Sequence, residues 1–183
     1  MPKKFNTTDI FECRRSGVSS GTLRGIVAAQ SSTLLLINTL EDGWFFDGYA
    51  VIRVDDITEY RFFRAKDSLE KRVQKLLGYA ATPPDIPLDL SSMRSVAQSL
   101  FEAGKMFSLE KEVSCKNTLW MGKIQRITAG SLYLAELDCE ARWSGGHRHS
   151  IAAITRIGFD NRYIRFYEML SAGSAVREPP LAQ

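Results

Sequence analysis

The chain repeats itself, and this repeat constrains its fold more than any other feature. When the sequence is shifted by 97 positions, the run Gly25–Phe63 falls without a gap on Gly122–Asp160. Identities at one unbroken offset, placed on glycines and apolar residues, indicate an internal duplication. The 183 residues are therefore expected to form two similar units of about 80–90 residues each. The identical pairs are Gly25 and Gly122, Leu35 and Leu132, Leu40 and Leu137, Gly48 and Gly145, Ile57 and Ile154, Thr58 and Thr155, and Phe62 and Phe159.

Each repeat has the pattern of five short strands with a polar break before the last one. Alternating and β-branched runs bounded by glycine and serine clusters are typical of strands. The breaks, Asp55–Ile57 and Ala152–Ile154, predict a single 3-10 turn in each repeat. Five such strands favour a small closed barrel, because closure removes the sheet edges. The expected strands are Ile10–Arg14, Thr22–Ala29, Thr33–Thr39, Tyr49–Val54 and Thr58–Phe63, then Met106–Glu112, Thr118–Ile127, Ser131–Asp138, Arg148–Ile151 and Thr155–Phe159.

Helices and a proline-rich segment separate the two units. Asp67 and Glu70 form a capping-box pattern ahead of an apolar stripe that ends at Gly78. A second helix is expected after Ser91 or Ser92, and a third after Asn161. The segment between them is expected to be an extended linker that packs through Ile86 and Leu88. The predicted organisation is a first barrel with its helix over 1–79, a linker over 80–90, a second barrel with flanking helices over 91–173, and a disordered tail over 174–183.

These features resemble those of a known class of small barrels. A glycine-bearing strand is followed by a leucine-rich strand, and Asp55-Asp56-Ile57-Thr58 or its counterpart precedes the last strand. The pattern is similar to that of Sm-like, SH3-type and PRC-type barrels, and to tandem-barrel proteins of unknown function found in bacterial genomes. The resemblance implies a mainly β, α+β fold of two duplicated five-stranded Sm/SH3-like barrels. It also implies ring assembly through edge strands and binding of uridine-rich RNA, although the RNA-contacting motif of bacterial Sm-like chaperones has no match here.

Composition narrows the class of protein further. The longest apolar run, Leu34–Ile37, is far shorter than the roughly 20 residues that span a bilayer. The amino terminus has no apolar signal core, so we expect a cytoplasmic protein that does not enter a membrane. Three cysteines, an odd number without close spacing, predict free thiols and no disulfide framework or zinc motif. The net charge of +3 arises in the second half, where arginine is frequent.

That second half holds a candidate nucleic-acid site. Cations neutralise phosphates and aromatic faces stack on bases, so a mixture of both is suited to single-stranded nucleic acid. The alternative is a set of solvated strand and helix faces whose arginines pair locally with carboxylates. The residues are Lys123, Arg126, Arg142, Trp143, Arg148 and Arg156.

Two further clusters are candidates for function. Both histidines of the chain, His147 and His149, lie two apart, which on a strand puts them on one face and within reach of one metal ion. The alternative is an ordinary surface hairpin with two histidines. Three consecutive aromatic residues, Trp44, Phe45 and Phe46, cannot all face one core, so at least one points outward or covers an edge, and the three are a candidate partner-binding patch. The alternative is that they serve the core and the cover of a helix.

The sequence therefore favours a non-enzymatic binding or adaptor protein without a cofactor. It contains no glycine-rich phosphate loop, no nucleophile motif and no dinucleotide fingerprint. We expect it to act through the surfaces or edges of its small barrels and to associate with a protein partner or with itself. The alternative is RNA or single-stranded nucleic-acid binding through the arginine-rich second unit. A metal-dependent enzyme at His147 and His149 is the remaining hypothesis.

Overall fold

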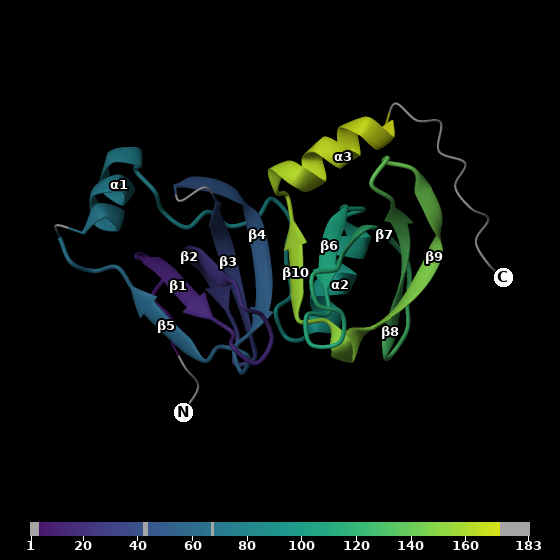
Figure 1. Cartoon of the computed structure of the whole chain (residues 1–183), viewed down its shortest axis with the longest axis horizontal. Coiled ribbons are helices and arrows are strands. Elements are labelled where there is room, and N and C mark those ends of the chain that lie inside the picture. Colours follow the sequence, from purple (N-terminus) through teal and green to yellow (C-terminus); the bar gives the residue numbers. More distant parts are fainter. Residues whose placement is uncertain (1–3, 42–43, 67, 173–183) are drawn as a thin grey trace.

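The ten strands of the described residues all belong to one antiparallel sheet. The computed structural model describes residues 4–41, 44–66 and 68–172. The strand order is β5-β1-β2-β3-β4-β10-β6-β7-β8-β9, so the first half of the chain forms one side of the sheet and the second half the other (Figure 1). The first five strands are β1 (Ile10–Arg14), β2 (Thr22–Gln30), β3 (Leu34–Glu41), β4 (Phe45–Arg53) and β5 (Glu59–Phe62), and the last five are β6 (Phe107–Glu110), β7 (Leu119–Ile127), β8 (Ser131–Leu137), β9 (Trp143–Ser150) and β10 (Arg156–Phe159).

The expectation of two closed five-stranded barrels is wrong. A barrel would require β5 to pair with β4 in the first half, and β10 with β9 in the second. Instead, β4 pairs with β10 across the middle of the molecule, so the two halves share one continuous open sheet. The physical reason is that the outer edge of β4 is already occupied by a strand of the other half. Strands β5 and β9 remain as the two ends of the sheet.

The duplication is visible in the irregularities of the sheet. The pairing of β2 with β3 shifts register between Val27 and Ala29, and that of β7 with β8 shifts between Ile124 and Arg126, which is 97 positions later. A second pair of shifts, in β3·β4 and β8·β9, has the same offset. Bulges set the local twist of a sheet, so the two halves bend at equivalent places. Gly25 of β2 also lies too close to the backbone of β3 to accept a Cβ atom, and its counterpart in β7 has the same constraint against β8.

The breaks before the last strands differ slightly from the prediction. Residues Ile151–Ala153 form a 3-10 helix, η1, one residue earlier than the expected Ala152–Ile154, and the Ile154 N–H donates to the Ile151 carbonyl. In the first half the equivalent Ile57 N–H bonds the Val54 carbonyl, but this is a single turn and not a helix. Ile57 and Ile154 are both buried, as the apolar residue in each break predicted.

Within the described ranges, three α-helices flank the sheet: α1 (Leu69–Leu77), α2 (Met93–Glu102) and α3 (Arg162–Ala172). Side-chain oxygens cap all three, with Ser68, Ser92 and Asn161 accepting from backbone N–H groups. Asp67, the expected cap of α1, and the expected tail over 174–183 lie outside the described residues. Only α2 is deeply packed. The apolar stripe of α1 is largely exposed, since Leu76 is 82% exposed.

The largest core cluster spans both halves. Leu34, Leu36 and Val51 of the first half pack with α2 and with strands of the second half. Ile86 and Leu88 pack against the same cluster, which confirms the expected role of the linker. A second cluster, formed by the inward residues of β1 to β4, belongs to the first half alone. The other half of the chain therefore buries the outer face of β3 and β4, which does not face solvent.

Candidate functional site: the sheet junction and the two free edges

The junction between the halves is a fully packed strand pair. In the register of β4 and β10, Val51 lies opposite Ile157 and Tyr49 opposite Phe159. Val51 and Ile157 are completely buried, and the rings of Tyr49 and Phe159 stack with centroids 5.1 Å apart. The chain thus contains one complete example of an edge of one repeat pairing with an edge of the other.

A buried ion pair ties the same junction together. Both terminal nitrogens of the Arg15 guanidinium donate to the Glu112 carboxylate, at 2.7 and 2.8 Å, and the two side chains are only 5% and 10% exposed. The Thr155 hydroxyl donates to the same carboxylate at 2.7 Å. Burial alone raises the pKa of Glu112, but the hydrogen bonds and charge of Arg15 outweigh it and hold that pKa below its usual range. Arg15 and Glu112 therefore join the β1–β2 loop to the β6–β7 loop.

A cavity of about 400 Å³ opens between these two loops. Its lining is mostly polar and includes Ser16, Ser19 and Asn117, with the carboxyls of Glu110 and Glu112. Burial raises the pKa of Glu110, partly offset by the nearby Arg156. Arg15 and Arg156 pair with these two carboxylates, so neither carboxylate presents an unopposed charge to the cavity.

One glycine pair shows what the junction requires. Gly48 has φ of +70°, and a Cβ atom there would overlap the backbone of Phe159, Asp160 and Asn161 at the end of β10. Its repeat counterpart, Gly145 of β9, lacks the positive φ, and nothing in the described chain lies within 4 Å of a Cβ built on it. The position that is crowded at the internal junction is therefore open at the free edge of β9.

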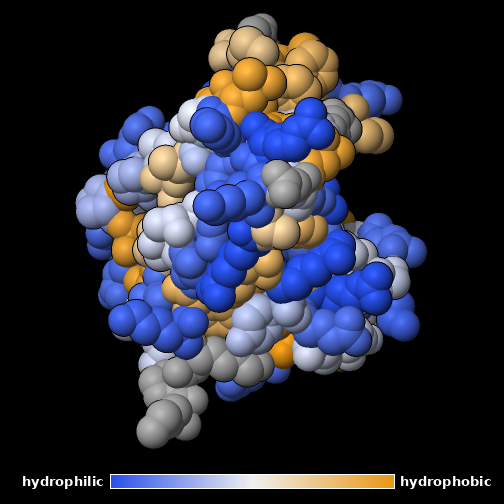
Figure 2. Space-filling view, turned by 90° about the vertical axis from the view of Figure 1, so that its left-hand side faces the viewer, coloured by the Kyte–Doolittle hydropathy of each residue, from blue (hydrophilic) through white to orange (hydrophobic). Residues whose placement is uncertain are grey.

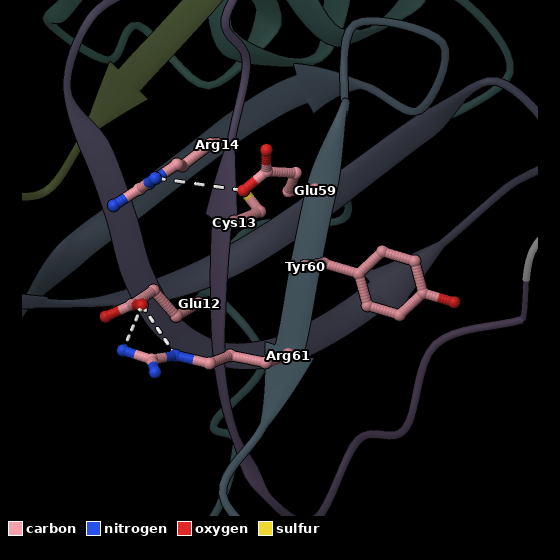
Figure 3. Close-up of a pocket in the computed structure, with 6 residues that line it drawn as sticks. All are labelled: Glu12, Cys13, Arg14, Glu59, Tyr60 and Arg61. Carbon is pink, nitrogen blue, oxygen red and sulfur yellow. Dashed lines mark hydrogen bonds and ion pairs between the residues drawn. The ribbon is translucent and has the colours of Figure 1, made fainter.

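The other free edge is β5, beside a shallow groove. The strand is exposed over Glu59, Tyr60 and Arg61, and it pairs only with β1. The groove has a volume of about 230 Å³ and is lined by β1 and β5 (Figure 3). Within it Arg61 pairs with Glu12 at 2.6 Å, while the ring of Tyr60 points away from these charges. The end of the molecule that bears β5 is largely hydrophilic, with apolar residues gathered at its top (Figure 2).

The two histidines both lie on β9, which begins earlier than the expected strand Arg148–Ile151, but their environments differ. His147 is exposed, whereas His149 is 3% exposed and bonds Glu136 Oε1 through Nε2 at 2.7 Å. Burial lowers the pKa of His149, and the Glu136 carboxylate opposes that shift. Among the described residues no group of three His, Cys, Asp or Glu side chains is placed to hold a metal ion.

The six residues of the candidate nucleic-acid site do not come together as one surface. Arg142 pairs with Asp138 and Glu140 in the β8–β9 hairpin, and Arg156 lies at the junction beside Glu110. Trp143 packs with a small cluster below α3.

The remaining three residues share the outer face of β7 to β9. Arg126 lies opposite Tyr133, and Tyr133 lies opposite Arg148, so the three side chains form a row across three strands. The Arg126 guanidinium is 4.1 Å from the Tyr133 ring centroid. Lys123, opposite Ala135, is exposed on the same face. Sequence reasoning missed Tyr133, which only the strand register places between two arginines.

The aromatic run is divided between core and surface. Trp44 and Phe46 pack against a small cluster around Ile10 and Ile26. The rings of Phe46 and Tyr79 have centroids 4.4 Å apart. Phe45 is 59% exposed. Of the three residues, only Phe45 is available to a partner, and the other two cover the outer face of the first half.

No helix within the described residues has the length and apolar character needed to cross a membrane. Comparisons with protein-family models, with curated proteins and with solved structures each returned no match.

Proposed function

We propose that this chain is a non-enzymatic binding protein that associates with further copies of itself through the two free edges of its sheet. The observation that carries the proposal is the β4·β10 junction, where one repeat already pairs with the other. By the 97-residue offset, β9 is the counterpart of β4, and β5 is the counterpart of β10. The edge of β9 in one copy therefore has the geometry to receive β5 of the next.

The register of this contact follows from the internal junction. Val51 opposite Ile157 becomes Arg148 opposite Tyr60, and Ala50 opposite Gly158 becomes His147 opposite Arg61. An arginine facing a tyrosine ring is a favourable cation–π pair. Unpaired backbone groups along both edges supply the hydrogen bonds of the added strand.

The association is expected to be weaker than the internal junction. Leu34, Leu36 and Val51, which the second half buries, correspond to Ser131, Tyr133 and Arg148 in the second repeat. The new contact therefore buries less apolar surface and depends more on polar groups. Because β9 and β5 are different surfaces, the contact is head-to-tail, and repetition gives a ring or an open chain.

The test uses the open space at Gly145. A Cβ built on Gly145 meets no atom of the described chain within 4 Å, so Gly145→Leu places its side chain in open space at the β9 edge, where it should obstruct an incoming β5 strand. Sedimentation velocity over a concentration series should show wild-type association and a monomeric variant. Gly130→Leu, whose Cβ position is equally open but which lies in the β7–β8 turn and not in the predicted β9–β5 pairing, is the control and should associate like the wild type. Monomeric wild type at every concentration, or an associating Gly145→Leu, would contradict the proposal.

A second candidate function rests on the row formed by Arg126, Tyr133 and Arg148. The Arg126 guanidinium lies over the Tyr133 ring on this strand face, and Arg148, opposite Tyr133, donates from Nε to the Ser131 hydroxyl. Lys123 is exposed on the same face. Such a surface suits stacking of bases and neutralisation of phosphates in single-stranded RNA. Fluorescence anisotropy with a labelled single-stranded RNA should then show binding that weakens steeply with salt.

Arg126 separates the two candidate functions because it lies on β7, away from both edges. If RNA binds to this face, Arg126→Gln should lower the affinity and reduce the slope of log affinity against log salt by about 0.7 for a lost phosphate contact. The same substitution should leave self-association unchanged. Absence of RNA binding at low salt would exclude this second function.

A further inference from the structure

The second half of the sheet contains a buried polar pair where the first half is apolar. His149 and Glu136 of the second repeat correspond to Ile52 and Thr39 of the first. Ile52 is completely buried in the first-half core, and His149 is nearly as buried, at 3% exposure. A histidine in an otherwise apolar strand position is costly to bury unless its polar atoms are satisfied. The fold alone does not explain why a buried apolar position of the first repeat holds a histidine in the second.

The hydrogen bonds fix which nitrogen carries the proton. Glu136 Oε1 lies 2.7 Å from His149 Nε2, and an ionised carboxylate can only accept. In the neutral ring Nε2 therefore donates, and Nδ1 holds the lone pair. Nδ1 is buried and has no hydrogen-bond partner among the described residues. Trp120 of β7 closes the site, with ring centroids 5.3 Å apart in an edge-to-face contact.

A second proton on this ring would have no acceptor. Protonation converts Nδ1 into an N–H donor in a position sealed from water, and a buried donor without a partner is unfavourable. Three charged or titratable groups face the ring: Glu136 from β8, Lys111 from the segment after β6, and His147 from β9 itself. Glu136 favours the cation, while Lys111 and His147 oppose it, and burial opposes it most strongly.

We propose that His149 is a pH-sensitive latch on the edge strand β9: protonation forces its ring out of the sheet toward water and loosens the end of that strand. The strand is easy to release because, in the part of the chain that the structure describes, β8 is the only strand hydrogen-bonded to it. Local openings at sheet edges have lower free energies than global unfolding. If β9 is the edge that receives another copy, which rests on the function proposed above, acidification also weakens self-association.

The sign of the pH dependence of stability follows from the direction in which folding shifts the pKa of His149. The pKa of His149 is lower in the folded chain than in the unfolded one, so the folded form resists the proton. The contribution of the neutral ring is fully present above about pH 6.5, the ordinary pKa of histidine, and is lost as the pH falls through the lower folded value.

The first test needs no association. Hydrogen exchange measured by mass spectrometry on dilute full-length protein, corrected for the intrinsic pH dependence of exchange, should show β9 losing about tenfold of its protection between about pH 7.5 and pH 5. Peptides from β3 and β4, the equivalent strands of the first half, are the internal control and should keep theirs. Unchanged protection of β9 would overturn the proposal and would leave the proposed self-association untouched.

The second test uses the first repeat as a template. The double substitution His149→Ile and Glu136→Thr copies Ile52 and Thr39 into the second half, and it should abolish the pH dependence of β9 protection. His147→Gln, two residues away on the same strand but exposed, should retain it. Since the chain has only two histidines, the imidazole resonances of the wild type can be assigned by these variants. A β9 dependence that survives in the double variant, or a His149 resonance that does not titrate below about pH 6.5, would refute the latch.

Discussion

Replacing Arg15 by methionine tests the junction between the halves most severely. Methionine replaces the apolar stem of Arg15 with an apolar side chain of similar length, but it lacks the guanidinium that donates twice to Glu112. Glu112 is 8% exposed and would retain the Thr155 hydroxyl as its nearest donor. Removing one partner of a buried ion pair leaves the other charge buried and unpaired, which lowers the free energy of unfolding by about 3–5 kcal/mol. We expect a loss of this size in the free energy of unfolding at neutral pH.

The pH dependence of the loss in the free energy of unfolding distinguishes an unpaired buried charge on Glu112 from a loss of packing. In the wild type the lowered pKa of Glu112 stabilises the fold above the unfolded pKa of the carboxyl, and this contribution is lost as the pH falls. Without Arg15 the burial penalty is opposed by the hydrogen bonds of the Thr155 and Ser19 hydroxyls and no longer by the guanidinium, so the pKa of Glu112 should rise from its wild-type value. The variant's deficit should then be largest at neutral pH and shrink on acidification, as Glu112 becomes neutral.

The assay is urea unfolding followed by tryptophan fluorescence at several pH values, with two companions. Arg14→Met removes the neighbouring arginine, whose contact with Glu59 is 3.8 Å long and exposed, and it should change stability by less than about 0.5 kcal/mol. The pair Arg15→Met with Glu112→Gln should recover part of the loss. A cost for Arg15→Met below about 1 kcal/mol, which is typical of exposed ion pairs, would refute the reasoning.

Three further predictions concern single positions. Gly48→Ala should lower the free energy of unfolding by about 1–3 kcal/mol, because Gly48 has a positive φ and a Cβ there would overlap the end of β10. Gly145→Ala should lower it by less than about 0.5 kcal/mol in the same thermal or urea unfolding experiments. Equal effects would contradict the difference in packing. Cys13 is 1% exposed and burial raises its pKa to about 11, so a thiol reagent at neutral pH should modify exposed Cys139 quickly and Cys13 only after denaturation. Ser92→Ala should lower stability by about 1 kcal/mol, since its hydroxyl accepts from the Ser95 N–H at 3.0 Å; no change would show that α2 does not need this cap.

The repeat predicted most elements, because strand patterns and caps are local signals. Ile10–Arg14 was placed correctly, and η1, α2 and the packing of Ile86 followed from short stretches of sequence. Strand β9 is longer than expected because glycines at 145 and 146 carry no apolar pattern.

The partner of β4 was not predicted, although the sequence contains a signal for it. A closed barrel would leave one face of β3 and β4 in water, yet Leu34, Leu36 and Val51 are apolar on that face. Their counterparts in the second repeat are polar. This asymmetry between otherwise equivalent positions indicates that only the first half is covered by another layer. Strand pairing between distant segments depends on which edges meet in space, and such information is absent from local periodicity.

The candidate sites depended on tertiary structure in the same way. Arg126 and Arg148 were recognised by type, but the ring of Tyr133 between them is set by the register of β7, β8 and β9. The burial of His149 against Glu136 was equally invisible, since residues on a strand alternate between faces whatever covers them.

The central claim, that the sheet continues from β9 of one copy to β5 of the next, is tested most directly by disulfide trapping in register. With exposed Cys139 replaced by serine, cysteines at Arg61 and His147 should lie directly opposite each other across the contact, at the separation that a disulfide bridges. Mild oxidation should then give covalent oligomers, and cysteines at Arg61 and Ser150, out of register, should give far fewer. Equal cross-linking of both pairs, or none of the first, would contradict the account.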